Sequence, residues 1–303
     1  MDRRRPRRQT LALAGGTPAV HNSADFMPPL AIAAALCSAL IHASWNAALK
    51  GGSDRVADAF LIAVGGMLTW AVVAAGWGAP AQAAWPFLAA TVLIHLCYWF
   101  ALFSAYDAGD LSHIYTLSRG SAPLLVTLGA GVAAHEIPPP VKAFGVALVS
   151  VGVLCVGASP RAPLKATLWA LTIGVCIASY SLVDALGSRA AGSALVYVAW
   201  ASGLMGVPMI GFALWRRGPK RLMADASVAP WRGIGIGIIS FAGYGLVLWA
   251  QTFAPIAPVT ALRETSVVFG ALIAFVVLRE RLGLRRWIGA AIVAMGAGLI
   301  AFG

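Results

Sequence analysis

The sequence predicts an all-α, polytopic membrane protein whose ten transmembrane helices form two inverted five-helix repeats. Three observations predict this fold: the composition, ten long apolar stretches and an internal repeat. Hydrophobic residues make up 60% of the 303 residues and charged residues only 11%, whereas a typical soluble protein has roughly 25% charged residues. Because so few charges cannot cover a surface that faces water, the composition excludes soluble, disordered and disulfide-framework proteins.

Ten apolar stretches are each long enough to cross a bilayer, which takes about 20 residues of helix. Breaks at charged residues, glycines and prolines place the stretches at 28–49, 57–78, 85–106, 113–134, 140–158, 166–187, 194–215, 231–252, 257–278 and 285–302. The apolar runs are continuous rather than alternating, which indicates helices. The longest connection runs from Arg216 to Arg232, so we expect no soluble domain.

Residues 1–26 differ from the rest of the chain, because five arginines lie between Met1 and Arg8. Three interpretations stay open for this segment. It is a disordered basic tail that is attracted to anionic lipid, a twin-arginine targeting signal, or a stretch upstream of a translation start at Met27.

An internal repeat divides the apolar part of the chain into 27–160 and 161–303. Glu136 aligns with Glu280, 144 positions later, and Arg119 aligns with Arg263 at the same offset. The glycine pairs Gly145 and Gly289, and Gly152 and Gly296, share that offset, whereas Trp45 and Asn46 align with Tyr180 and Ser181 at an offset of 135. Five helices per repeat is an odd number, so the second repeat enters the membrane from the opposite side. This arrangement is typical of secondary transporters.

The two halves resemble the EamA domains of the drug/metabolite transporter superfamily. The likeness is carried by 119–136 with 145–157, by 263–280 with 289–298, and by 42–46 in the first stretch; it covers 28–303. The resemblance implies a ten-helix carrier that moves small metabolites by alternating access. The second half has Val267 where the first has Pro123, so we expect the local helix shape to differ.

Arg119 and Arg263 are the first candidates for a substrate site. Each lies about two turns inside its apolar stretch, where an arginine costs roughly 2.5–3.5 kcal/mol at the membrane centre. Both should therefore face a polar cavity or a partner. The planar guanidinium suits a carboxylate or a phosphate. The alternative is a structural clamp, with Arg263 held by Glu264 or Arg119 by a carbonyl at a helix end.

Glu264 is the one carboxylate deep in a late apolar stretch. It could bind a substrate ammonium, carry the proton of a coupled exchange, or neutralise Arg119 or Arg263. An arginine and a glutamate in one cavity would suit an amino acid as well as a plain anion.

Aromatic and polar residues at matched places of the repeats are further cavity candidates. These are Trp45, Asn46, Tyr180 and Ser181, together with Tyr115, although anchoring at the membrane interface explains the aromatic residues equally well. We expect His42, His95 and His113 to be packing or cavity residues rather than proton relays. Tyr98, Trp99, Tyr244 and Trp249 have weaker claims on a cavity.

No pattern in the sequence indicates catalysis, a metal or a cofactor. No Gly-x-Ser-x-Gly, His-Glu-x-x-His or P-loop motif occurs, and the four cysteines lack metal-site spacing. Asp107 and Asp110 lie in one loop, where Asp110 fits a helix cap. Glu136 and Glu280 end helices, and we expect structural or gating roles for them.

Loop charges give conflicting evidence on orientation. The two loop faces carry thirteen and two Lys or Arg residues, which places the termini outside if the chain starts at Met27. The five tail arginines favour cytoplasmic termini instead, and the orientation stays open.

The sequence as a whole favours a secondary transporter of small polar metabolites, amino-acid-like or anionic. The alternatives are a flippase for a lipid-linked headgroup and a membrane protein that transports nothing. The expected partners are a small-molecule substrate, the lipid bilayer and, as one option, a second copy in a homodimer; nucleic acid is not expected. The expected location is a bacterial cytoplasmic (inner) membrane.

Overall fold

The computed structural model describes residues 27–49, 54–106, 108–157, 159 and 161–303, and within these ranges it contains helices and no strand. The helices are α1 (Pro29–Leu49), α2 (Arg55–Trp77), η1 (Gln82–Ala84), α3 (Trp85–Tyr106), α4 (Leu111–Ala133), α5 (Pro140–Gly157), α6 (Leu164–Ala190), α7 (Ala194–Arg217), α8 (Pro219–Ala226), α9 (Pro230–Gln251), α10 (Ile256–Arg263), α11 (Ser266–Val276) and α12 (Leu284–Phe302). The predicted all-α membrane fold is confirmed. The predicted tail and Lys50 and Asp107 lie outside the described residues.

The predicted apolar stretches coincide with these helices to within a few residues. Nine segments of the described chain are long and apolar enough to cross a membrane, with α10 and α11 together forming one of them. The tenth predicted crossing is α4, whose 23 residues extend about 34 Å at 1.5 Å per residue. Its N-terminal half carries Ser, His, Thr and Arg side chains, many of them buried, which lowers its apolar character.

Two details differ from the prediction. The stretch expected at 257–278 is broken at Glu264 and Thr265, where the backbone bonds span three residues instead of four, as from the Thr265 amide to the Leu262 carbonyl. The connection from Arg216 to Arg232 contains the short helix α8. Pro123 lies inside the unbroken α4. The expected difference in helix shape between the two halves is present. The helix that is interrupted, however, belongs to the second half, which lacks the proline.

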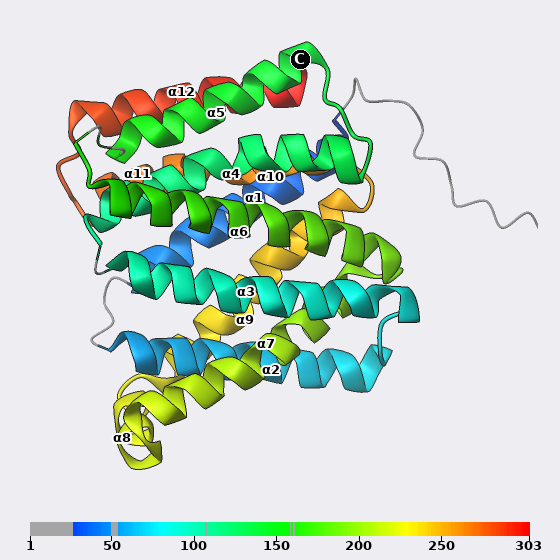
Figure 1. Ribbon diagram of the computed structural model, residues 1–303, viewed down its shortest axis with the longest axis vertical. Helices are drawn as coiled ribbons and strands as arrows, with labels where there is room; N and C mark the ends of the chain where they lie inside the picture. Colours follow the sequence, from blue (N-terminus) through cyan, green and yellow to red (C-terminus); the bar gives the residue numbers. More distant parts are fainter. Residues whose placement is uncertain (1–26, 50–53, 107, 158, 160) are drawn as a thin grey trace, which may run out of the picture.

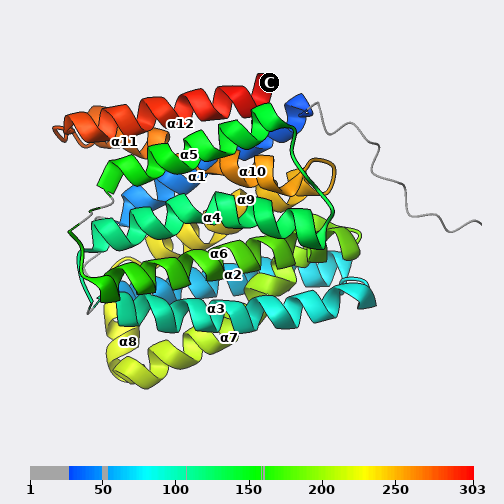
Figure 2. The same cartoon turned by 45° about the horizontal axis from the view of Figure 1, so that its top comes forward.

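The helices of the two halves interleave rather than forming two separate bundles (Figure 1; Figure 2). At one end of the molecule α5 lies beside α12, and towards the other α2 packs against α7. Contacts of α6 with α3 and α4 are matched by contacts of α1 with α9 and with α10 and α11. Helices of the first half therefore pack against α6 of the second half, and helices of the second half pack against α1 of the first half.

The contact between α5 and α12 explains the repeated glycines. A Cβ atom on Gly152 would lie 2.8 Å from the Gly289 carbonyl oxygen, and one on Gly145 would lie 2.9 Å from that of Gly296. The repeat-related glycines thus lie against each other's backbones, and larger residues would separate the helices.

The two predicted helix ends at Glu136 and Glu280 have the same backbone geometry. His135 and Arg279, which precede them, have φ of 55° and 54°. The Glu136 amide bonds to the Ala130 carbonyl and the Glu280 amide to the Ala274 carbonyl, at 3.1 and 2.9 Å. The repeat seen in the sequence is therefore also present in the local backbone.

The order of the crossings gives the molecule two faces. We call the face where α1 begins and α12 ends the terminal face, and the opposite one the basic face. The sequence places thirteen Lys and Arg residues on one loop face. Apart from Lys50, which lies outside the described residues, all of them lie on the basic face. Lys142 and Arg189 fall on the terminal face, where Lys142 is 1% exposed.

Candidate substrate site

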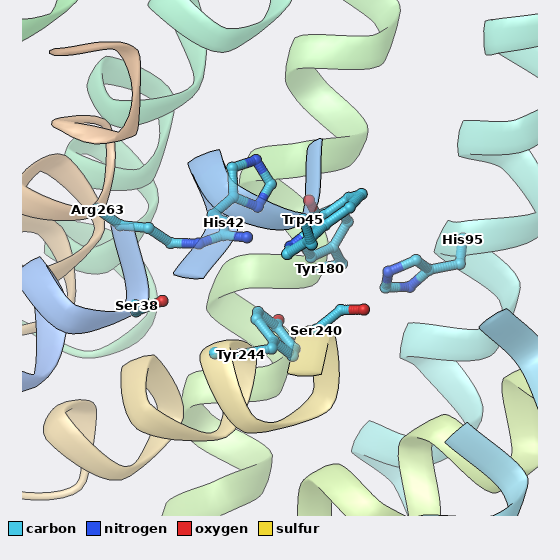
Figure 3. A pocket seen from close by; sticks show the side chains of 9 residues that line it. Ser38, His42, Trp45, His95, Tyr180, Ser240, Tyr244 and Arg263 are labelled. Carbon is cyan, nitrogen blue, oxygen red and sulfur yellow. The ribbon is translucent and has the colours of Figure 1, made fainter. Parts of the chain in front are cut away.

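A cavity of about 180 Å³ lies between helices of both halves. Its walls come from α1, α3, α6, α9 and the end of α10, and they consist of Ser38, His42, Trp45, His95, Tyr180, Ser240, Gly243, Tyr244 and Arg263. Figure 3 shows the Arg263 side chain extending into this space, with His42 and Trp45 on one side and Tyr244 and Ser240 on the other.

Arg263 is the charged end of the cavity. It is the last residue of α10 and half-buried, and its guanidinium carbon lies 5.6 Å from the centre of the Tyr244 ring. Among the described residues it forms no ion pair, and its Nε has no hydrogen-bond partner. The helix break directly after Arg263 places it at a discontinuity inside the membrane, a feature of many transporter binding sites.

Arg119, the counterpart of Arg263, has different surroundings. Its Nη2 lies 3.0 Å from Oε1 of Glu264, and the side chains of the pair are only 7% and 2% exposed. Glu264 thus pairs with the arginine of the other half and not with its neighbour Arg263. This buried pair joins α4 to the break between α10 and α11.

The aromatic candidates separate into two groups. Trp45 and Tyr180, which the repeat relates, both line the cavity. Asn46 does not, since its amide nitrogen donates to the His42 carbonyl at 2.7 Å. Tyr115 is 44% exposed and also lies outside the cavity.

Sequence reasoning gave too little weight to three cavity residues. His42 contacts the edge of Trp45 with ring centres 5.0 Å apart, and His95 stacks on Tyr180 at 4.3 Å. Tyr244 supports Arg263. Polar side chains inside apolar stretches were the available signal, but periodicity alone could not show that they converge. His113 instead packs, with Nε2 3.2 Å from the Thr167 hydroxyl and Nδ1 accepting from the Ser159 amide.

Asp184 was missed altogether. It is 1% exposed and accepts hydrogen bonds from the Tyr197 and Tyr244 hydroxyls. The predicted stretch ended at residue 187, which placed Asp184 near a membrane surface. The helix continues to Ala190, so the carboxylate lies inside the bundle, where charged groups are usually functional.

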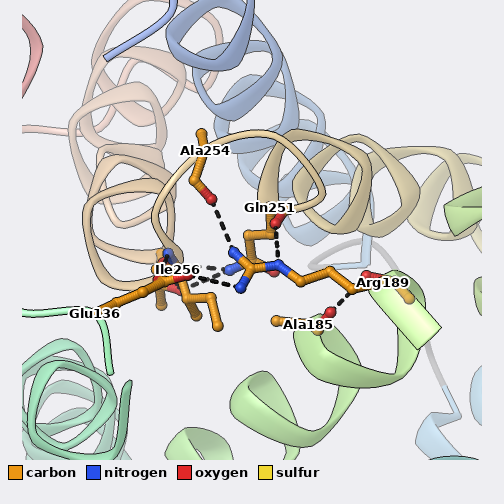
Figure 4. Close-up of polar contacts among 8 residues, drawn as sticks. Glu136, Ala185, Arg189, Gln251, Ala254 and Ile256 are labelled. Atoms are coloured by element: carbon orange, nitrogen blue, oxygen red, sulfur yellow. Dashed lines mark hydrogen bonds and ion pairs between the residues drawn. The ribbon is translucent and has the colours of Figure 1, made fainter. Parts of the chain in front are cut away.

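A cluster on the terminal face joins the two halves (Figure 4). Glu136 accepts from Arg189 Nη1 at 2.6 Å and from the Ile256 amide at 2.7 Å. The other Arg189 nitrogens donate to the carbonyls of Gln251 and Ala254, at 2.7 and 3.1 Å. We call these residues the Glu136–Arg189 cluster. It ties the link after α4 to the end of α6 and to the start of α10.

Ion pairs also join the halves on the basic face. Asp54 lies 2.6 Å from Arg217, and Asp58 lies 2.7 Å from Arg232. Asp54 caps α2, and the Ala57 amide, followed by the Val56 amide and Arg217, lowers its pKa against the opposing effect of burial. On the same face Asp110 accepts from the Ser112 amide at 2.7 Å, which confirms its predicted role as a helix cap.

Comparison with known proteins supports the fold and the family. Residues 164–302 match the EamA-like transporter family. Among 29 similar chains of solved structure is one titled "Crystal structure of protein", with 17% sequence identity and a TM-score of 0.71, covering 90% of this chain and 98% of that one. This similarity shows the fold alone. No curated protein matches the chain. Residues 164–302 therefore match an EamA-like domain, a family of the drug/metabolite transporter superfamily, and the long apolar helices of the described chain identify an integral membrane protein.

Proposed function

We propose that the protein is a secondary transporter of small organic anions, amino-acid-like ones included, and that the cavity beside Arg263 is its substrate site. The observation that carries this proposal is the contrast between the two repeat-related arginines. Arg119 is neutralised by Glu264, whereas Arg263 has no ion-pair partner in the described chain and extends into the cavity.

The charge of the cavity favours an anion. No Asp or Glu side chain of the described residues lines it, so its fixed charge comes from Arg263. A guanidinium binds a carboxylate or a sulfonate through two parallel N–H bonds, and such bonds are strong where water is scarce. A cationic substrate would meet no compensating carboxylate on this wall.

The size and the walls of the cavity favour a small, partly planar substrate. A volume of about 180 Å³ is below the roughly 300–1,000 Å³ of sites for drug-sized ligands. Trp45, Tyr180 and Tyr244 offer ring faces, and the Ser38 hydroxyl, which lacks a partner in the described chain, offers a hydrogen bond. An anion with a short apolar or aromatic group would use all of these features.

Alternating access would proceed by movement of the two repeats, proposed at 27–160 and 161–303. The Glu136–Arg189 cluster joins them at the terminal face and the Asp54–Arg217 pair at the basic face. We propose that each set opens in turn, because a carrier must expose its site to one side at a time. The proposed membrane is the cytoplasmic membrane of a bacterium.

A thermal-shift screen on purified protein tests the substrate class. A ligand that binds the folded state raises the apparent melting temperature, so benzenesulfonate and small carboxylates should raise it, and amines of similar size should not. Arg263→Gln should abolish the shift. The matched control Arg216→Gln, at an exposed position on the basic face, should keep it.

Flux through proteoliposomes then tests transport itself. A labelled anion from the screen should accumulate through the wild type and not through Arg263→Gln. Stabilisation by amines alone, or full anion binding by Arg263→Gln, would contradict the proposed site.

A further inference from the structure

A second ionisable group lies just behind the cavity wall. Asp184 is buried between α3, α6, α7 and α9, and no Lys, Arg or His of the described chain forms an ion pair with it. Its two carboxyl oxygens instead accept from two phenols, Oδ1 from Tyr197 at 2.9 Å and Oδ2 from Tyr244. The carboxylate is thus solvated by hydroxyl groups and not by a cation.

Tyr244 connects this carboxylate to the cavity. Its hydroxyl bonds Asp184, its ring supports the Arg263 guanidinium, and it lines the cavity itself. A substrate molecule therefore meets Tyr244 and not Asp184. A proton can move along the hydrogen bond between Tyr244 and Asp184, whereas a larger cation such as an ammonium group cannot pass Tyr244.

The other ionisable groups near Asp184 lie on the cavity side. His95 of α3 faces the cavity, and its Nδ1–H donates to the Thr91 carbonyl at 2.8 Å, because a carbonyl oxygen can only accept. Tyr180 of α6 stacks on His95. Arg263 of α10 lies against Tyr244 at the cavity, and Arg119 of α4 is paired with Glu264. Neither arginine forms an ion pair with Asp184.

We propose that Asp184 is a proton-binding group coupled to the cavity, and that it takes up a proton when an anion binds at Arg263. This inference rests on the proposed function for its anion. Glu264, for which the sequence left a coupling role open, forms an ion pair with Arg119, whereas Asp184 has no ion-pair partner in the described chain.

The proton reaches Asp184 through one exchange at Tyr244. The Tyr244 hydroxyl gives its hydrogen to Oδ2 of Asp184 and takes one from a hydronium ion in the cavity, which becomes water. One O–H bond forms on Asp184 and one breaks on the hydronium ion, so Tyr244 ends unchanged.

Two effects couple this proton to the anion. An ionised Asp184 repels an anion in the cavity, and its protonation removes that repulsion. A protonated carboxyl also needs an acceptor, so one phenol must turn, and Tyr244 is the phenol that supports Arg263. By reciprocity, a bound anion favours the protonated form as much as the proton favours the anion.

Infrared spectroscopy of the reconstituted protein tests the proton site without any substrate. As the pH falls, the wild type should gain a carboxylic-acid C=O band typical of a buried group, and Asp184→Asn should lose that band. Asp225→Asn, a matched change on α8 at the basic face, should keep it. Tyr244→Phe should retain the band but show it at higher pH, because the ionised carboxylate loses a donor. A band that survives in Asp184→Asn, or a wild type without one, would overturn the proposal.

Anion binding against pH tests the coupling. Benzenesulfonate serves as the probe because it stays ionised throughout, so any proton taken up belongs to the protein. Wild-type affinity should rise at least about fivefold as the pH falls, and Asp184→Asn should bind tightly at every pH. Asp225→Asn should keep the pH dependence, and a dependence that His95→Gln removes while Asp184→Asn retains it would overturn the assignment to Asp184.

The two proposals fail in different ways. If the wild type binds benzenesulfonate equally well at all pH values, the coupling is wrong and the anion site stands. If it never binds the probe while the Asp184 band appears, the anion site and its coupling are wrong and the proton-binding group stands.

Discussion

The fourth crossing of each half carries an arginine at the same place in the repeat, yet the two arginines have different surroundings. In α4 the helix is continuous, and Arg119 is buried against Glu264. In the second half the crossing breaks into α10 and α11, and Arg263, at the break, extends into the cavity.

The repeat therefore gives the two arginines equivalent positions but not the same role. One carboxylate, Glu264, can neutralise only one of two nearby arginines. It neutralises the arginine of the other half, because adjacent positions on a helix point about 100° apart. The arginine that is left over provides the positive charge of the cavity.

Removal of Arg119 should have the largest effect on stability. Breaking a buried ion pair leaves an uncompensated charge and costs about 3–5 kcal/mol, so Arg119→Ala should lower the free energy of unfolding by about that amount. Denaturant unfolding in detergent measures it.

The combined variant Arg119→Leu with Glu264→Leu is the control for this pair. It should recover most of the loss, because it leaves no buried charge unpaired. If the combined loss equals or exceeds that of Arg119→Ala, the pair is not what stabilises this contact.

Removal of Arg263 should affect binding and hardly affect stability. A hydrogen bond to a charged group contributes about 1.5–3 kcal/mol, so Arg263→Ala should weaken anion binding by about 10- to 150-fold. Titration calorimetry with the best anion of the screen measures it. A loss of stability as large as that of Arg119→Ala would mean that the two arginines play the same role after all.

The glycines of α5 and α12 should show the symmetry that the arginines lack. Gly152→Ala and Gly289→Ala each place a Cβ within 2.8 Å of the facing backbone, and such overpacking costs about 1–3 kcal/mol. Thermal unfolding should show equal losses for the two. Gly298→Ala, where no heavy atom lies within 4 Å of the new Cβ, is the matched control and should be nearly neutral; unequal losses would argue against a symmetric contact.

The caps of α2 and α7 give the smallest expected effect. Asp54 caps α2 with a carboxylate, whereas Ser193 caps α7 with a hydroxyl. Because the pKa of Asp54 is lowered in the folded protein, its contribution is present above the ordinary carboxyl value of 3.8 and is lost as the pH falls through the lowered value.

Asp54→Ser should therefore cost at most about 1 kcal/mol at neutral pH and should flatten the acid side of the stability profile. Unfolding at a series of pH values measures this. Ser193→Ala should lower stability equally at every pH, and a profile unchanged by Asp54→Ser would exclude the capping carboxylate as its cause.

The class of protein, the crossings and the repeat follow from the sequence alone. Length, apolar content and the cost of charges in lipid are local properties, so ten stretches could be placed to within a few residues. The repeated Glu residues likewise predicted matching helix ends, and the repeated Gly residues marked the matched positions that the structure places in contact between α5 and α12.

Which polar residues line a common cavity depends on how helices that are distant in the sequence pack together. Asn46 and Trp45 are neighbours in sequence, yet only Trp45 reaches the cavity, because adjacent side chains of a helix point in different directions. The partner of Glu264 and the two phenols on Asp184 come from other helices, and nothing in the spacing along one chain shows how far apart those helices lie. Charge placement therefore follows from sequence, whereas charge pairing depends on the packing of distant helices.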